Sequence, residues 1–143
     1  LQQRVNNEGL SSRVLFTGAV PHKEVGIHLR SATVLVAPTR HGLEGWPMAP
    51  LEGLAMGAPV IGPAAGPFPF MIEHGINGLL FKVNCVEDLR DKIENILNNP
   101  GLRQRLHCGA KDKSEERKKM KIKDFGEALR AACSHQINKG LPL

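Results

Sequence analysis

The sequence predicts an α/β fold in which a mainly parallel sheet is covered by helices. Short runs of aliphatic and β-branched residues are typical of strands buried on both faces, and segments with helical periodicity lie between these runs. Because parallel strands are joined by crossovers, which helices usually supply, this alternation indicates right-handed βαβ units.

Strands and helices alternate along most of the chain. The strands are predicted at residues 13–17, 33–37, 59–62 and 78–82, and the helices at 23–31, 48–56 and 86–97. Gly57 fits a left-handed cap after the second helix, and the Asn98-Asn99-Pro100 cluster ends the third. From residue 102 onward the pattern is helical, with a break expected near Gly109 and a last amphipathic piece that begins near Phe125.

The composition excludes several classes of protein. A chain of 143 residues with 41% hydrophobic and 23% charged residues is typical of one globular domain with a modest core. Its apolar runs are far shorter than the roughly 20 residues of a membrane-spanning helix. Cys85, Cys108 and Cys133 have no paired spacing, so neither a metal site nor a disulfide framework is expected, and we expect a cytoplasmic location.

Most of the formal net charge of +5 comes from residues 111–123. We favour a solvated helix face, because Glu115 and Glu116 interrupt the basic run. The alternative is a surface for acidic lipid or a lipid-linked acceptor, at the periphery of a membrane. Nucleic-acid binding is not expected, because no aromatic residues interleave with the basic ones. We therefore divide the chain into a binding domain at 1–110 and a basic helical extension at 111–143.

The loop at residues 38–47 is the first candidate for a binding site. Ligands of parallel sheets bind beyond the carboxyl ends of the strands, where this loop, with Thr39 in it, is expected to lie. The loop opens onto a predicted helix whose first backbone N–H groups have no partner inside the helix. Phosphate is a natural partner for such groups.

The sequence EGWPMAPLEGLAMGAPVI at residues 44–61 resembles the signature of retaining glycosyltransferases of the GT-B fold, with two glutamates separated by seven residues. The similarity extends to VLFTGAVP at 14–21 and to GINGLLF at 75–81, in the family's order. Three ordered blocks rarely arise by chance. The resemblance implies a Rossmann-like sheet that forms part of the C-terminal, nucleotide-sugar-binding half of that fold.

The resemblance assigns roles to the residues of the longest block. Glu52 would accept hydrogen bonds from the ribose hydroxyls, and Glu44 would lie close to the donor sugar as the catalytic carboxylate. Gly45 would let the backbone pass near the ligand, and the amides of Met48 and Ala49 would face the diphosphate. Each glutamate also has a simpler interpretation, Glu52 as an exposed helix residue and Glu44 as a helix cap.

Further contacts follow from the flanking blocks. Val20 matches a loop that meets the nucleobase mainly through backbone groups, so UDP-, GDP- and ADP-sugars all stay open as donors. Gly66 fits a later glycine of the family, and Thr39 is an additional candidate contact. The resemblance implies no metal and no cofactor besides the nucleotide sugar.

The implied activity is transfer of a sugar from a nucleotide diphosphate sugar to a hydroxyl acceptor with retention of configuration. The alternatives are a non-catalytic nucleotide-sugar-binding or scaffolding subunit, or a related epimerase or phosphorylase. The family's acceptor-binding domain has no counterpart in this chain, which we therefore expect to be inactive alone.

The family's sheet also has two strands without a counterpart here, and they would lie between the strands predicted at 13–17 and 33–37. The resemblance therefore predicts an interrupted sheet with unpaired edges. We expect the chain to be part of a larger structure, to be rearranged, or to be completed by a partner or another copy, so a homo-oligomer stays open.

Overall fold

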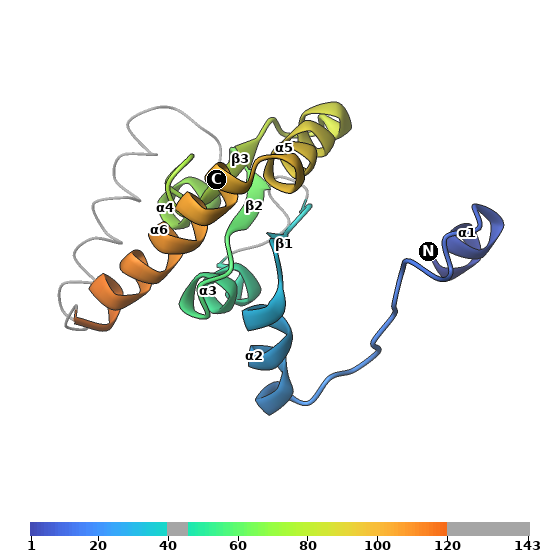
Figure 1. Cartoon of the computed structure of the whole chain (residues 1–143), viewed down its shortest axis with the longest axis horizontal. Coiled ribbons are helices and arrows are strands. Elements are labelled where there is room, and N and C mark those ends of the chain that lie inside the picture. Colours follow the sequence, from blue (N-terminus) through green and yellow to red (C-terminus); the bar gives the residue numbers. More distant parts are fainter. Residues whose placement is uncertain (40–45, 120–143) are drawn as a thin grey trace.

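The described part of the chain is a small parallel sheet with helices on both faces. The structure is a computed structural model that describes residues 1–39 and 46–119. In chain order, the elements are α1 (Gln2–Asn7), α2 (His22–Ser31), β1 (Leu35–Val36), α3 (Met48–Ala55), β2 (Val60–Pro63), α4 (Phe68–Met71), β3 (Gly78–Phe81), α5 (Val86–Asn98) and α6 (Pro100–Lys119), as drawn in Figure 1.

The strands lie in the order β1-β2-β3, and both pairs are parallel. Val36 of β1 is in register with Ile61 of β2, and Ile61 with Leu79 of β3. All residues of the central strand β2 are buried, as expected when helices cover both faces of a parallel sheet. The predicted α/β class with a parallel sheet is confirmed.

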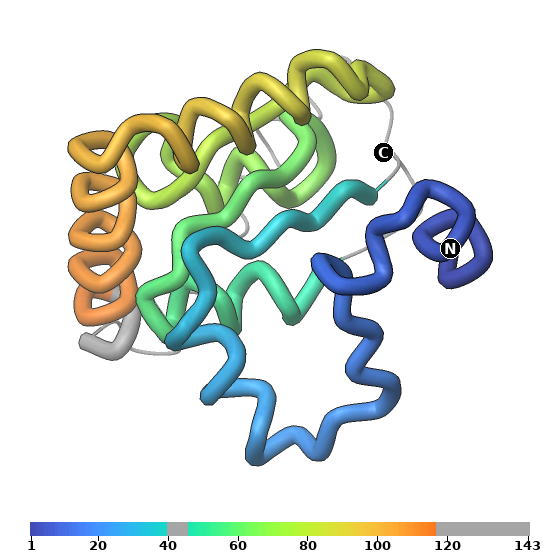
Figure 2. The backbone as a smooth tube through the Cα atoms, turned by 45° about the vertical axis from the view of Figure 1, so that its right-hand side comes forward, coloured from blue at the N-terminus to red at the C-terminus, as the bar shows by residue number. Residues whose placement is uncertain are grey.

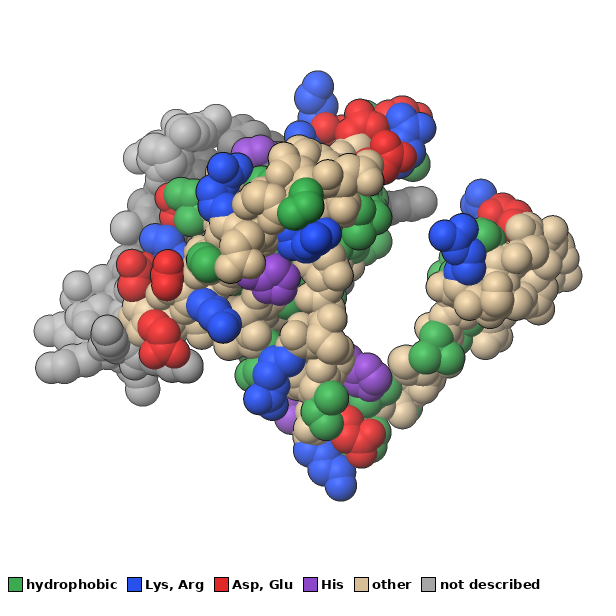
Figure 3. Space-filling model, in the orientation of Figure 1, with side chains coloured by type: hydrophobic (Ala, Val, Ile, Leu, Met, Phe, Trp, Pro, Cys, Tyr) green, Lys and Arg blue, Asp and Glu red, His purple; other side chains and the backbone are tan. Residues whose placement is uncertain are grey.

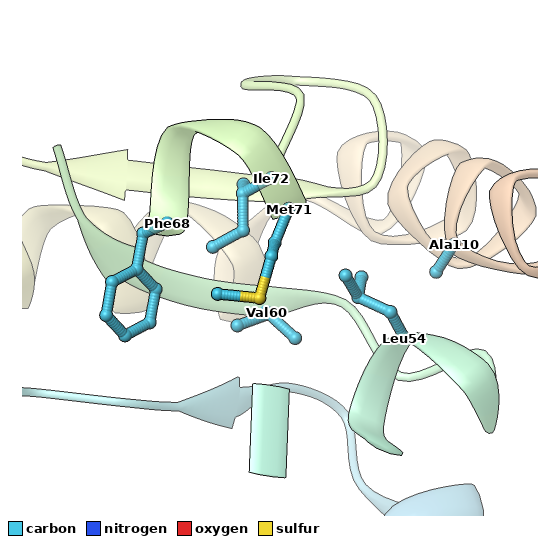
Figure 4. Packing of buried hydrophobic residues seen from close by; sticks show 6 residues of the cluster. All are labelled: Leu54, Val60, Phe68, Met71, Ile72 and Ala110. Atoms are coloured by element: carbon cyan, nitrogen blue, oxygen red, sulfur yellow. The ribbon is translucent and has the colours of Figure 1, made fainter. Parts of the chain in front are cut away.

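Two hydrophobic clusters lie on opposite faces of β2, because successive side chains of a strand alternate between its faces. On one face, Val60 packs with Leu54 of α3 and with Phe68 of α4 (Figure 4). On the other face, Ile61 packs with Ile96 of α5. Helices α3 and α4 therefore form one layer, and α5 contributes to the other.

Helix α6 connects the two layers. Its first half contributes Leu102 and Leu106 to the cluster on the α5 side, and Ala110 reaches the cluster on the α3 side. A Cβ atom at Gly109 would collide with the backbone carbonyl of Ile76. The break predicted near Gly109 is therefore wrong: the glycine lets α6 lie directly against the turn before β3, and the helix continues to Lys119.

Residues 13–17 do not form the predicted strand. Leu15 is 84% exposed, and the chain between α1 and α2 stands apart from the sheet (Figure 1). A strand needs a neighbour for its backbone hydrogen bonds, and this segment has none beside it. The placement agrees with the expected interruption of the sheet between this segment and β1.

The remaining predicted elements agree within one or two residues, apart from the second strand, which is shortened to Leu35–Val36. The short helices α1 and α4 were not predicted. The predicted domain division at residue 110 falls inside α6 and stays a prediction, and the amphipathic segment beginning near Phe125 lies outside the described residues. Within residues 1–39 and 46–119, no helix combines the length and the apolar character needed to cross a bilayer.

Candidate functional site

The carboxyl ends of the three strands open onto loops along one edge of the sheet. β1 leads into residues 37–39, β2 into 64–67 and β3 into 82–85. The ladder extends to this edge: the Ala37 N–H donates to the carbonyl of Ile61 at 2.9 Å, and the Ala64 N–H to that of Phe81 at 2.7 Å. Because ligands of parallel sheets bind beyond the carboxyl ends, this edge is the candidate site.

Helix α3 begins at this edge without a side-chain cap. Its N-cap is Pro47, whose side chain has no hydrogen-bond acceptor, and no cap hydrogen bond is made. Met48 and Ala49, the first residues of the helix, are both exposed. Their N–H groups have no partner inside the helix, and together with the positive end of the helix dipole they suit an anion.

Glu52 lies one turn beyond Met48 on the same side of α3, since residues four apart face the same way. Its side chain is half-buried and has no hydrogen-bond or ion-pair partner among the described residues. The next residue, Gly53, lets α3 approach β1 closely: a Cβ atom there would lie 2.7 Å from Leu35 Cδ2. The Glu52 carboxylate is therefore uncommitted and stands on a helix that is fixed against the sheet.

The far end of α3 is tied to α6. Gly57 has a φ of +82° and donates its N–H to the Leu54 carbonyl at 3.0 Å, so the predicted left-handed cap is confirmed. His107 Nδ1 lies 2.9 Å from the Gly57 carbonyl oxygen, and Ser114 Oγ donates to the Ala55 carbonyl at 3.3 Å. These contacts satisfy carbonyl groups at the end of α3 and fix the direction of the helix.

The loop after β2 forms the second part of the edge. Gly66 has a φ of +57°, and no atom lies within 4 Å of the place where its Cβ would be. The following helix α4 has Pro67 as its N-cap, again without a side-chain hydrogen bond. This glycine therefore serves the backbone turn and leaves open space beside it.

Asn77 holds the turn that follows α4, a role the sequence analysis missed. Its side chain is 1% exposed, its Oδ1 accepts the Glu73 N–H at 2.8 Å, and its Nδ2 donates to the Met71 carbonyl at 3.1 Å. Asn77 thereby fixes the end of α4 and, through this short helix, the loop at 64–67. The sequence feature that could have indicated this role is a polar residue inside the glycine-flanked sequence GING, which is typical of a turn.

Asp88 holds the third part of the edge, the loop at residues 82–85, in place. Its Oδ2 accepts the Lys82 N–H at 2.7 Å, and its Oδ1 lies 3.5 Å from Lys92 Nζ. The hydrogen bond from the Lys82 backbone, and then the charge of Lys92, hold the pKa of Asp88 below its ordinary value. The start of α5 is thereby attached to the end of β3.

The other predicted site residues do not all lie at this edge of the sheet. Thr39 lies two residues beyond Ala37, to whose carbonyl it donates its N–H at 2.9 Å, so it belongs to the edge. Glu44 and Gly45 lie outside the described residues. Val20 is half-buried and precedes α2, whose start lies away from the carboxyl tip of β1 in Figures 1 and 2. The structure thus brings Thr39, the start of α3 and Gly66 to one edge but leaves the segment before α2 apart.

The described residues include no group of three or more His, Cys, Asp or Glu side chains that could hold a metal ion. The candidate site therefore consists of backbone amides, an uncommitted carboxylate and turn glycines.

Comparison with known sequences identifies relatives of most of the chain. The profile of the family described as Glycosyl transferases group 1 matches residues 1–113. A glycosyltransferase of Methanocaldococcus jannaschii, itself uncharacterised, is 34% identical over 105 residues, which cover 73% of this chain and 29% of that protein. The D-inositol 3-phosphate glycosyltransferase of Frankia alni is 31% identical over 102 residues, with 71% and 25% covered. The chain thus spans less than a third of the length of either relative.

Solved structures share the fold. The C-terminal domain of a glycosyl transferase group 1 family protein from Francisella tularensis superposes with a TM-score of 0.73 and 24% identity, over 84% of this chain and 61% of that one. A protein of Anabaena, crystallised with UDP, gives a TM-score of 0.72 and 18% identity, over 94% and 35% of the two chains. At these identities the similarity establishes the architecture alone.

Proposed function

Because the chain belongs to the glycosyl transferases group 1 family, we propose that it is the donor-binding part of an enzyme that transfers a sugar from a nucleotide diphosphate sugar to a hydroxyl acceptor, with retention of configuration. The family match over residues 1–113 carries this proposal, since it includes all three loops at the carboxyl edge. The Anabaena neighbour was crystallised with UDP and with UDP-glucose, which supports a nucleotide diphosphate as the ligand class.

The diphosphate would bind at the start of α3. The amides of Met48 and Ala49 are the free donors there, and Pro47 and Pro50 contribute none. The uncapped N-terminus supports this assignment, because no side chain of the protein competes for these amides. Gly66 would admit the ligand from the neighbouring loop, and Thr39 would line the same edge.

The ribose would bind at Glu52. A carboxylate can accept hydrogen bonds from two neighbouring hydroxyl groups at once, and that of Glu52 has no described partner to give up. Its place one turn along α3 supports the assignment, because a ribose follows directly on a diphosphate held at the helix start.

The donor sugar would lie beside Glu44. A carboxylate at that point can orient sugar hydroxyls and stabilise the positive charge that develops at the anomeric carbon. Gly45 would keep the backbone close to the sugar. We propose no metal, because the backbone amides at the start of α3 and the positive end of its dipole would meet the charge of the diphosphate.

Calorimetric titration of the chain with UDP, GDP, ADP and UDP-glucose tests the proposal. We compare the wild type with Glu52→Gln, which keeps the shape of the side chain and removes its charge. The matched control is Glu94→Gln on α5, whose helix packs on the opposite face of the sheet. Loss of a hydrogen bond to a charged group costs about 1.5–3 kcal/mol, so Glu52→Gln should weaken binding by roughly tenfold to 150-fold.

The control variant should bind like the wild type. If Glu52→Gln binds as tightly as the wild type, the ribose assignment is wrong. If the wild type binds none of the nucleotides, the chain is not the donor-binding part that we propose.

A second candidate function is nucleotide-sugar binding without transfer. The two candidates differ in turnover: binding of UDP-glucose without release of UDP, in the presence of hydroxyl acceptors, would favour the binding subunit.

The cellular location of the enzyme and the role of its basic segment are part of the same proposal. We infer a cytoplasmic reaction. For residues 111–123 we favour a solvated surface, and contact with acidic lipid or a lipid-linked acceptor is the alternative. Binding of the chain to anionic vesicles that weakens at high salt would support the membrane-facing role.

A further inference from the structure

Helix α6 packs against α3 and contacts its C-terminal end, which lies opposite the proposed diphosphate site. His107 and Ser114, two turns apart on one face of α6, reach the carbonyl groups of Gly57 and Ala55 at 2.9 and 3.3 Å. Because a carbonyl oxygen only accepts hydrogen bonds, Nδ1 of His107 carries the proton in this contact. Both contacts therefore donate from α6 to the end of α3.

The charges around this end of α3 suit the helix dipole. The C-terminal end of a helix carries partial negative charge and favours cations beside it. The side chain of Lys111 lies over Gly57, where an added Cβ atom would be 3.1 Å from its Cγ. In the space-filling view, Lys, Arg and His side chains lie on the face where α6 passes α3 (Figures 1 and 3). Hydrogen bonds and basic side chains thus act at the same end of the helix.

The other contacts described for α3 are mostly apolar. Leu54 packs with Val60 in the hydrophobic cluster, and Gly53 lies against the side chain of Leu35. The N-cap, Pro47, makes no side-chain hydrogen bond. Apolar burial is non-directional, whereas a hydrogen bond restricts both a distance and an angle. The contacts from α6 therefore restrain the orientation of α3 more narrowly than its apolar packing does.

A change at the C-terminal end of α3 would be transmitted to its first turn. The helix runs from Met48 to Ala55, which corresponds to a length of about 12 Å. A tilt of about 10° around its C-terminal end would displace the first amides by about 2 Å, which is enough to break a hydrogen bond to a ligand. The amides of Met48 and Ala49 and the Glu52 carboxylate belong to this helix, so all three would be displaced.

We propose that His107 and Ser114 are positioning residues for a nucleoside diphosphate: by holding the C-terminal end of α3, they set the affinity of the groups at its start. The inference rests on the proposed function, which supplies the ligand class. Neither side chain contacts the ligand in this arrangement, because both act at the end of α3 opposite Met48. Their effect on binding is therefore carried by the helix.

Three substitutions test the two hydrogen bonds. His107→Phe keeps a ring and removes the donor, His107→Asn places an amide N–H near the position of Nδ1, and Ser114→Ala removes the hydroxyl group. In calorimetric titrations with UDP, GDP and ADP, His107→Phe and Ser114→Ala should raise the dissociation constant by roughly twofold to thirtyfold. His107→Asn should restore most of the affinity lost in His107→Phe.

The matched control is Ile96→Val. It removes a buried methylene group from the cluster on the α5 side of the sheet, and so lowers stability without touching α3. Its dissociation constants should equal those of the wild type. Equal losses of affinity in Ile96→Val and His107→Phe would mean that general destabilisation is the cause, and the inference would be overturned.

Amide hydrogen exchange, measured by NMR without nucleotide, reports on α3 itself. The N–H groups of Met56 and Ala58 donate to the carbonyls of Glu52 and Gly53 at 3.0 and 2.9 Å. These two amides should exchange several-fold faster in His107→Phe than in the wild type, because the end of the helix opens more often. Ile96→Val should not reproduce this local change.

The outcomes separate this inference from the proposed function. Weaker binding and faster exchange in His107→Phe, both reversed in His107→Asn, would support it. If the wild type binds a nucleotide and both donor-deleting variants bind it equally well, the positioning role is wrong and the proposed function stands. Faster exchange with unchanged affinity leads to the same conclusion. A wild type that binds none of the nucleotides would overturn both.

Discussion

Replacing Gly109 with alanine tests how closely α6 lies against the turn before β3. In an isolated helix this change is favourable, because alanine is preferred over glycine by about 1 kcal/mol. In the folded chain, a Cβ atom at this position would collide with the carbonyl oxygen of Ile76, and it would lie 2.7 Å from the carbonyl carbon and 3.1 Å from Cγ2 of the same residue. Most of these contacts are with backbone atoms, which cannot move by a change of rotamer as a side chain can.

The expected size of the effect follows from these contacts. Either α6 or the turn must move away, and overpacking of this kind costs about 1–3 kcal/mol, more when backbone is involved. The movement would also strain the hydrogen bond from Arg105 Nε to the Gly75 carbonyl at 3.2 Å. After the gain of about 1 kcal/mol in helix propensity is subtracted, we expect Gly109→Ala to lower the free energy of unfolding by up to about 2 kcal/mol.

Urea denaturation followed by circular dichroism measures this difference. Gly101→Ala is the matched control, because Gly101 belongs to the same helix and its added Cβ would meet only Asn99 Oδ1, at 3.5 Å. The control should change the free energy of unfolding by less than about 0.5 kcal/mol, or raise it slightly. If Gly109→Ala is as stable as Gly101→Ala, the close approach of α6 to the turn is not real and the reasoning fails.

Three more predictions concern other contacts that hold the described elements in place. The pKa of Asp88 is lowered in the folded state, so its contribution to stability is present above its unfolded pKa of about 4 and is lost as the pH falls through the lower folded value. The difference in Tm between wild type and Asp88→Asn should therefore shrink from pH 7 toward pH 3, and a constant difference would contradict this. Asn77→Leu removes the hydrogen bonds that Asn77 makes to the Glu73 N–H and to the Met71 carbonyl and should cost about 2–4 kcal/mol in chemical denaturation; a loss below about 0.5 kcal/mol would show that water replaces the side chain. Gly57→Ala places a side chain at a φ of +82° and should cost about 1–2 kcal/mol in the same assay, whereas an unchanged midpoint would mean that the cap relaxes freely.

The sequence predicted the elements that local patterns determine. The apolar run of β2 identified a strand buried on both faces, and the periodicity of Leu89, Ile93 and Ile96 identified α5. Gly57 identified the end of α3 because a left-handed cap has a strong local preference for glycine. In the candidate site, the spacing of Met48 and Glu52 was enough to place both on one side of a helix.

The features that were missed depend on contacts between distant segments. Residues 13–17 have the composition of a buried strand, but a strand forms only where another strand lies beside it. Gly109 looked like a helix break because its neighbour, the turn at Ile76, is far away in sequence. The hydrogen bonds of Asn77 and Asp88 likewise join backbone groups whose positions only the folded chain defines.

The outer edge of β3 is covered by side chains of the same chain, which bears on whether a further strand can pair there. The Leu80 N–H donates to His74 Nδ1 at 2.9 Å and the Lys82 N–H to Asp88 Oδ2 at 2.7 Å, so side chains of the same chain occupy positions where a neighbouring strand would form its hydrogen bonds. A strand added at β3 would first have to displace these two side chains, and a double substitution of His74 and Asp88 would expose the backbone groups that they cover.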